Sequence, residues 1–142
     1  MRSIMPTKTE IVAEAKTWIG TPFKHQGRVK GLGVDCVGLI IGVAHFFKLT
    51  DFDYVNYSHT PDGFLMRQLL DQHLYSIPIP EAKAGDIVLM RFEAQPQHVG
   101  ILSDYGIIHA YAQVRRCVEH RLDQHWRSRI VGAYAYPDMK DK

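Results

Sequence analysis

The hydrophobic pattern of this 142-residue chain changes its period near the middle of the sequence. Up to about residue 75 the apolar residues recur every three or four positions, which is typical of amphipathic helices. From residue 87 onward they alternate in short runs divided by turn residues, which is typical of strands. Helices first and strands afterwards, without strand–helix alternation, predict an α+β domain with an antiparallel sheet.

Two helices are expected in the first third of the chain. The first covers 9–19, because Thr7 and Glu10 have the spacing of a capping box just before an apolar periodic segment. The second begins at Asp35, after a glycine-rich segment over 23–34 that we interpret as an exposed loop.

Gly38 and Gly42 lie inside this second helix, where each costs about 1 kcal/mol in helix propensity. Tertiary packing must therefore hold the helix, and the spacing of four lets another backbone come close. A loop over 51–62 follows, and Asp62 is the candidate N-cap of a third helix. The strands that we expect after this helix are 87–92, 98–102, 107–111, 114–122 and 130–136.

The composition is that of an ordinary globular domain, with 46% hydrophobic and 23% charged residues. The formal net charge of +2 is too small to indicate a surface that binds nucleic acid. No apolar run approaches the roughly 18 residues that a membrane span needs. We therefore expect a single domain over 1–142, with its core over about 9–137 and with neither a nucleic-acid partner nor a membrane span.

The first ten residues contain one arginine and one lysine but no apolar segment. We therefore expect no secretory signal and synthesis in the cytoplasm. A protein of this kind that acts outside the cytoplasm needs something else to carry it there.

Cys36 stands where the glycine-rich segment becomes a helix. A helix N-terminus carries about half a positive charge and unpaired N–H groups, which lower the pKa of a thiol. The same N–H groups can hold the oxyanion that forms when a thiolate attacks a carbonyl. A buried structural cysteine is the other interpretation, and the local sequence leaves both open.

His98 and His109 can supply a base for such a nucleophile and a residue that orients the base. They lie in two adjacent strand-like runs separated by the turn residues 103–106. If the first and last residues of this turn pair, the two histidines are diagonal neighbours on one face, with Cα atoms about 7–8 Å apart. A slip of one residue would place them on opposite faces.

These residues resemble a known family. Asp35-Cys36-Val37-Gly38-Leu39-Ile40 is similar to the Asp-Cys-Ser-Gly-Leu signature of the NlpC/P60 cysteine peptidases. Four further blocks match that family in order: Gly20-Thr21-Pro22-Phe23, Ala84-Gly85-Asp86-Ile87-Val88, His98-Val99-Gly100-Ile101 and Ile108-His109-Ala110. The resemblance extends from about residue 11 to 136. The segments 25–28 and 117–122 are most similar to a phage-encoded, tail-associated branch of the family.

The resemblance implies a papain-like fold, with N-terminal helices packed on a C-terminal antiparallel sheet. It also implies hydrolysis of peptide bonds in bacterial peptidoglycan stem peptides, usually between D-γ-glutamyl and a diamino acid. In this scheme Cys36 is the nucleophile, His98 is the base and later the acid, and His109 orients His98, with no metal or cofactor. Asp35 matches a position for substrate recognition, where a carboxylate can hold the free amine of a stem peptide. Phage tail proteins are the implied partners, with action in the periplasm or cell wall after delivery by a virion.

Two departures from the family pattern bear on activity. Phe23 occupies a position where family members often have a tyrosine beside the catalytic cysteine, so a possible oxyanion donor is lost. Loss of one such donor can lower a rate about 10²–10³-fold. Val37 replaces the common serine after the cysteine and changes the expected substrate contacts.

Three alternatives remain open from the sequence. The chain can be a non-catalytic tail-tip or hub subunit that keeps the peptidase fold, a zinc protein with Cys36, His98 and His109 as ligands, or an amidase or acyltransferase with the same chemistry. The other histidines receive no catalytic role: we place His45 near a helix end and expect His59, His73, His120 and His125 to be exposed.

Overall fold

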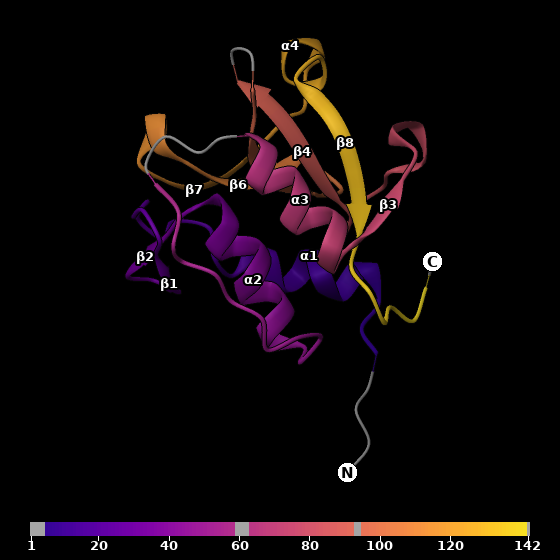
Figure 1. The fold of residues 1–142 in the computed structure, drawn as a ribbon, viewed down its shortest axis with the longest axis horizontal. Coiled ribbons are helices and arrows are strands. Elements are labelled where there is room, and N and C mark those ends of the chain that lie inside the picture. The colour runs from indigo at the N-terminus through magenta and orange to yellow at the C-terminus, as the bar shows by residue number, and fades with distance from the viewer. Residues whose placement is uncertain (1–4, 59–62, 93–94, 142) are drawn as a thin grey trace.

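The computed structural model describes residues 5–58, 63–92 and 95–141. Its three longer helices are α1 (Lys8–Lys16), α2 (Cys36–Phe46) and α3 (Gly63–His73). Figure 1 shows α3 in front of the sheet, with α2 beside it, and all three helices contact the central strand β5 (Gln95–Leu102). The predicted α+β class, with N-terminal helices on an antiparallel sheet, is confirmed. Within the described ranges, no helix is long and apolar enough to span a bilayer.

The large sheet has six strands in the order β3-β8-β4-β5-β6-β7, and every neighbouring pair is antiparallel. Besides β5, the strands are β3 (Tyr75–Ile77), β4 (Ile87–Phe92), β6 (Ile107–Tyr111), β7 (Arg116–His120) and β8 (Ile130–Ala135). The predicted bounds of β4 and β6 are right at both ends. β7 is shorter than predicted because residues 112–114 form a 3₁₀ turn that ends at Arg115 with a φ of 64°.

The prediction lacks three short strands. β1 (Arg28–Val29) and β2 (Gly33–Val34) form a hairpin inside the segment expected to be a loop. β3 pairs with β8, about sixty residues away in the sequence. Strands of two or three residues are too short to show alternation, so only their partners reveal them. The candidate N-cap Asp62 lies outside the described residues.

α1 begins as the sequence predicts. The Thr7 hydroxyl accepts a hydrogen bond from the Glu10 backbone N–H, and the Glu10 carboxylate accepts one from the Thr7 N–H. The helix ends at Lys16 rather than at residue 19, because residues 17–20 form turns instead. The reciprocal cap therefore fixes the start of α1, whereas its apolar periodicity continues beyond its end.

The hydrophobic core lies between the helices and the sheet. Its fully buried members come from both layers and include Ile11, Leu39, Val43, Ile87, Leu89, Ile101 and Ile108. The second cysteine, Cys117, is buried in this core with a free thiol. A buried ion pair between Lys8 and Asp86 joins α1 to the segment before β4. The Tyr136 hydroxyl donates to the Ile40 carbonyl at 2.7 Å and joins the chain after β8 to α2. These two contacts hold the helical layer on the sheet.

Gly38 and Gly42 allow two close approaches to α2: the predicted approach of a backbone occurs at Gly38, whereas a side chain approaches at Gly42. A Cβ atom at Gly38 would lie 2.1 Å from the Gly27 carbonyl oxygen. A Cβ atom at Gly42 would lie 2.3 Å from the Trp18 ring. The first glycine thus lets the loop backbone reach the start of α2, and the second lets the aromatic ring after α1 pack against it.

We expect Gly42→Ala to lower the free energy of unfolding by up to about 2 kcal/mol. Overpacking against Trp18 costs typically 1–3 kcal/mol, and the gain of about 1 kcal/mol in helix propensity offsets part of it. Urea denaturation measures the change. Gly132→Ala is the matched control, because its Cβ atom would lie 3.5 Å from its nearest neighbour. Equal unfolding midpoints for the two variants would contradict the packing argument.

Candidate active site

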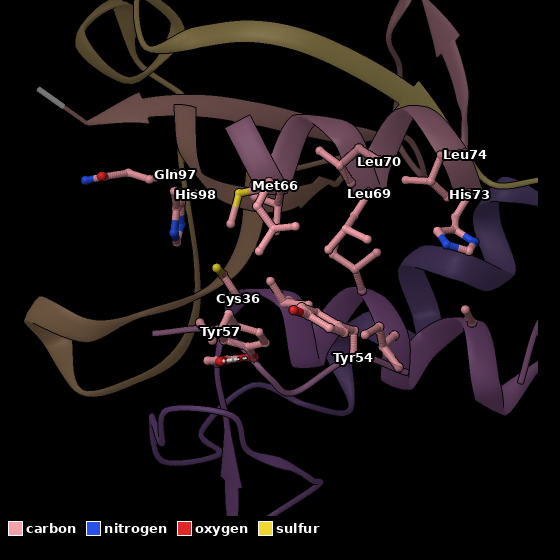
Figure 2. Close-up of a pocket in the computed structure, with 18 of the residues that line it drawn as sticks. Cys36, Tyr54, Tyr57, Met66, Leu69, Leu70, His73, Leu74, Gln97 and His98 are labelled. Carbon is pink, nitrogen blue, oxygen red and sulfur yellow. Dashed lines mark hydrogen bonds between the residues drawn. The ribbon is translucent and has the colours of Figure 1, made fainter. Parts of the chain in front are cut away.

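Cys36 is the first residue of α2, and Asp35 is the N-cap of that helix. The Asp35 carboxylate accepts the Gly38 N–H at 2.8 Å, which fixes the first turn and directs the Cys36 side chain into a cavity. Cys36 is half-buried there, and His98 lines the same cavity. Figure 2 shows the Cys36 sulfur and the His98 ring pointing toward each other from α2 and β5. The helix start and the sheet therefore meet at this pair.

The hairpin of β5 and β6 has the register that the turn residues predict. Ile101 pairs with Ile108 and Leu102 with Ile107, so His98 and His109 lie on one face. His98 Nε2 is 2.5 Å from His109 Nδ1. Gly100 makes room for this contact, because a Cβ atom there would lie 3.1 Å from the His109 Cβ atom. The hairpin thus brings the two predicted histidines into direct hydrogen-bond contact.

A third histidine, His120, extends this pair, and the sequence analysis missed it. His109 Nε2 is 2.8 Å from His120 Nε2, and His120 Nδ1 is 2.7 Å from the Arg121 carbonyl oxygen. The expectation that His120 is exposed is wrong, since its side chain is half-buried in this chain of imidazoles. The same register argument could have found it. β7 pairs Val118 with His109, so His120 is a diagonal neighbour on the same face.

Aromatic side chains enclose the three imidazoles. Phe92 stacks on His98 with ring centroids 4.9 Å apart, and Tyr111 stacks on His109 at 5.2 Å. Trp126, on the short helix α4 (Gln124–Arg127), contacts the rings of both His109 and His120. His98 and His109 are 5% and 0% exposed, respectively, so both imidazoles are removed from water.

Burial sets the protonation states of the site. It raises the pKa of the Cys36 thiol to about 12, with the Asp35 charge acting in the same direction and backbone hydrogen bonds opposing it. Burial also lowers the pKa of His98 to about 3, and the Arg129 and His120 charges add to this shift. The expectation that the helix N-terminus would leave Cys36 with a lowered pKa is therefore wrong. The free site contains a neutral thiol beside a neutral imidazole at neutral pH.

The Asp35 carboxylate contacts four donors of its own chain. Besides the Gly38 N–H, it accepts the Gln26 N–H at 2.8 Å, Arg28 Nη1 at 3.0 Å and the Tyr57 hydroxyl at 2.5 Å. Asp35 is 4% exposed, and burial followed by its hydrogen bond to Asp35 raises the pKa of Tyr57. In this arrangement Asp35 anchors the loop before α2, and a substrate amine would have to displace one of these donors. Amine binding by Asp35 stays a prediction.

The cavity has a volume of about 380 Å³ and lies between α2, α3 and the end of the sheet that carries His98. Figure 2 shows Met66, Leu69 and Leu70 of α3 along its upper side. Phe23 also lines it, and no hydroxyl stands at that ring position. Aliphatic and aromatic side chains make up most of the wall, so the cavity suits the apolar parts of a ligand.

The zinc alternative lacks a suitable ligand set. Among the residues that the structure describes, no three His, Cys, Asp or Glu side chains are arranged to hold a metal ion. His98 Nε2 and His109 Nδ1 face each other rather than a shared point. Cys36 and His98 instead line one cavity, and His98 contacts a second imidazole.

Comparison with known proteins agrees with this geometry. The model of the NlpC/P60 family matches residues 20–135. Among solved structures, the chain is similar to the NlpC/P60 domain of the peptidoglycan hydrolase SagA, with 25% identity and a TM-score of 0.65. The similarity covers 91% of this chain and 98% of that domain. No curated protein sequence matches the chain.

Two longer proteins share the fold. An NlpC/P60 family protein of Bacillus cereus is 20% identical with a TM-score of 0.70, over 94% of this chain and 41% of that protein. A lipoprotein-like NLP/P60 family protein of Staphylococcus aureus is 22% identical with a TM-score of 0.64, over 91% of this chain and 41% of that protein. The chain therefore spans less than half the length of these two relatives.

We expect Asp35→Ala to lower the free energy of unfolding by about 2–5 kcal/mol, because it removes the helix cap and leaves the half-buried Arg28 guanidinium with Asp53 as its remaining carboxylate partner. Asp53→Ala is the matched control, since Asp53 also pairs with Arg28, at 2.9 Å, but its side chain is 37% exposed. The control is expected to cost less than about 1 kcal/mol. Chemical denaturation of both variants tests the difference, and similar losses would contradict the anchoring role of Asp35.

We also expect acid to destabilise the fold through His98 and His109. Burial lowers the pKa of His98 to about 3 and that of His109 to about 2, whereas an unfolded histidine titrates near pH 6.5. The full free energy of unfolding is therefore present above about pH 6.5. Below that pH the unfolded chain binds a proton on each of these histidines and the folded chain does not, so the free energy of unfolding falls by about 1.4 kcal/mol per pH unit for each.

The measurement is the unfolding midpoint in urea at about pH 7 and about pH 5. In His109→Gln the amide does not titrate, so this variant is expected to lose less stability between the two pH values than the wild type. Parallel losses in both proteins would show that His109 is not kept neutral by burial.

Proposed function

We propose that this chain, which belongs to the NlpC/P60 family, is a cysteine peptidase that hydrolyses peptide bonds in the stem peptides of bacterial peptidoglycan. The observation that carries the proposal is the placement of Cys36, at the head of α2, in one cavity with His98, whose ring contacts His109. The similarity to the domain of the peptidoglycan hydrolase SagA supports the choice of substrate. The proposed bond is that between D-γ-glutamyl and a diamino acid.

In the proposed reaction, Cys36 attacks the amide carbonyl while its thiol proton passes to His98. The raised pKa of the thiol and the lowered pKa of the imidazole, both caused first by burial, support this order. His98 Nε2 faces His109, so Nδ1 is the ring nitrogen left for Cys36. The imidazolium that forms gives its proton to the leaving amine, and water then releases the acyl group from Cys36 with His98 as base again.

Backbone N–H groups are the proposed oxyanion donors. Backbone hydrogen bonds from Val99, Val37 and Cys36 lower the pKa of the Cys36 thiol, which supports the N–H groups beside the sulfur as donors. Phe23 in the cavity wall offers no hydroxyl for this purpose. We therefore propose that the backbone at the start of α2 stabilises the tetrahedral intermediate without a tyrosine.

Delivery by a phage tail is a further part of this proposal. The similarity of segments 25–28 and 117–122 to the tail-associated branch supports it. In the structure both segments belong to the site: the first packs against Asp35 through the Gln26 N–H, and the second contains His120. We propose action in the periplasm or cell wall, with tail proteins as partners, after synthesis in the host cytoplasm.

A non-catalytic tail subunit that keeps the fold is the second candidate. The observation in its favour is Phe23, which removes a hydroxyl from the proposed oxyanion site. The candidate needs no nucleophile, so it predicts that replacement of Cys36 changes nothing except packing. The two candidates predict different results when wild-type and Cys36→Ala chains are incubated with peptidoglycan.

We expect the wild-type chain to release new amino termini from purified peptidoglycan and Cys36→Ala to release none. Cys117→Ala is the matched control, because Cys117 is buried in the core and lies outside the cavity. This control is expected to keep its activity with at most a modest loss of stability. Mass spectrometry of the soluble products identifies the cleaved bond. Equal release by wild type and Cys36→Ala would reject the peptidase and favour the structural subunit.

A further inference from the structure

We propose that His120 is a positioning residue that determines which ring nitrogen of His98 carries the proton. It acts through His109, which lies between the two. The inference rests on the proposed function, because the tautomer of His98 matters chemically when His98 is the base for Cys36. It adds a fourth side chain to the three that the sequence predicted.

The hydrogen-bond chain has a direction because it ends on a backbone carbonyl. His120 Nδ1 is 2.7 Å from the Arg121 carbonyl oxygen. A carbonyl oxygen only accepts hydrogen bonds, so His120 Nδ1 carries a hydrogen. When His120 is neutral, its other nitrogen, Nε2, is then an acceptor, and the direction described below is that of this neutral form.

Each imidazole passes this direction to the next. His109 Nε2 is 2.8 Å from the acceptor on His120, so it donates, and His109 Nδ1 is then an acceptor. His98 Nε2 is 2.5 Å from that acceptor and donates in turn. The hydrogen of His98 is therefore on Nε2, and the lone pair is on Nδ1, the nitrogen left for Cys36.

The opposite direction would leave the site without a base. His98 would then carry its hydrogen on Nδ1 and present an N–H to the Cys36 thiol. Because burial keeps both groups neutral, the thiol proton has no other acceptor on His98. In a serine protease triad, a wrong imidazole tautomer lowers kcat about 10⁴-fold. The hydrogen bond between His120 and the Arg121 carbonyl thus decides whether His98 can accept the proton of Cys36.

The fold holds His120 in place for this role. Its strand partner is Ile107, next to the turn that Gly106 closes. A Cβ atom at Gly106 would lie 2.1 Å from the His120 carbonyl oxygen, so only glycine allows this approach. Trp126 covers the other side, with its ring centroid 4.9 Å from that of His120. Asp123 caps α4 through the Trp126 N–H and so fixes the covering ring.

The ¹⁵N chemical shifts of the ring nitrogens of the three histidines measure the direction of the hydrogen bonds, and the measurement needs no substrate. In ¹⁵N-histidine-labelled full chain at neutral pH, we expect His98 Nε2 and His109 Nε2 to show the shifts of protonated nitrogens. The Nδ1 atoms of both rings are expected to show the shifts of unprotonated nitrogens, and His120 the reverse pattern. A protonated Nδ1 on His98 would overturn the proposal, and this measurement needs no variant.

Two variants separate positioning from packing. His120→Phe keeps an aromatic ring against Trp126 but has no acceptor, whereas His120→Gln keeps an acceptor in its amide oxygen. The readout is the rate at which iodoacetamide alkylates Cys36 at neutral pH, with mass spectrometry to confirm the modified cysteine. His125→Gln is the matched control, because His125 is exposed on α4 and its ring contacts Arg129 rather than one of the three histidines.

We expect His120→Phe to lower the alkylation rate about 5- to 150-fold. The basis is the cost of about 1–3 kcal/mol for a buried N–H left without an acceptor, at 1.4 kcal/mol per tenfold. His120→Gln is expected to recover most of the rate and His125→Gln to change nothing. Unchanged rates and unchanged His98 shifts in His120→Phe would overturn the proposal.

These measurements remain separate from the proposed substrate. A chain that shows the expected shifts and alkylation rates but cleaves no peptidoglycan rejects the substrate and leaves the role of His120 in place. A chain that cleaves peptidoglycan with a protonated His98 Nδ1 keeps the peptidase and rejects the role of His120.

Discussion

The burial of His98 and the partial burial of Cys36 are the constraint on which the site depends. Desolvation lowers the pKa of the imidazole and raises the pKa of the thiol, so it opposes the charged form of both groups. The proposed reaction therefore depends on geometry, namely on which nitrogen of His98 carries the proton and on the direction of the hydrogen bonds from His98 through His109 to His120. The hairpin register, the glycines that permit close approach and the aromatic cover all serve this geometry.

Asp35 has a second, mechanical part in the site. It lies between the nucleophile and the loop, and its four hydrogen bonds join the start of α2 to Gln26, Arg28 and Tyr57. The same carboxylate raises the pKa of the neighbouring thiol. The residue that holds Cys36 in position therefore also opposes its ionisation, which supports proton transfer during attack in the proposed reaction.

The sequence was a good guide where one local rule decides the structure. The capping box at Thr7 and Glu10, the N-cap at Asp35 and the turn after β5 involve residues a few positions apart. It was a poor guide to β1, β2 and β3, since two or three residues give no periodic signal and their pairing partners decide their conformation. It also failed for His120, which gains its neighbours only when β7 pairs with β6.

The sequence by itself determined the α+β class, the helix start at Cys36 and the shared face of His98 and His109, because hydrophobic period, capping and hairpin register are local properties. Only the tertiary structure decided that Cys36 and His98 meet in one cavity, that Asp35 is enclosed by four donors and that His120 completes the imidazole chain. The pKa values also belong to the tertiary structure. Burial depends on which distant segments cover a side chain, and no local pattern in the sequence encodes that cover.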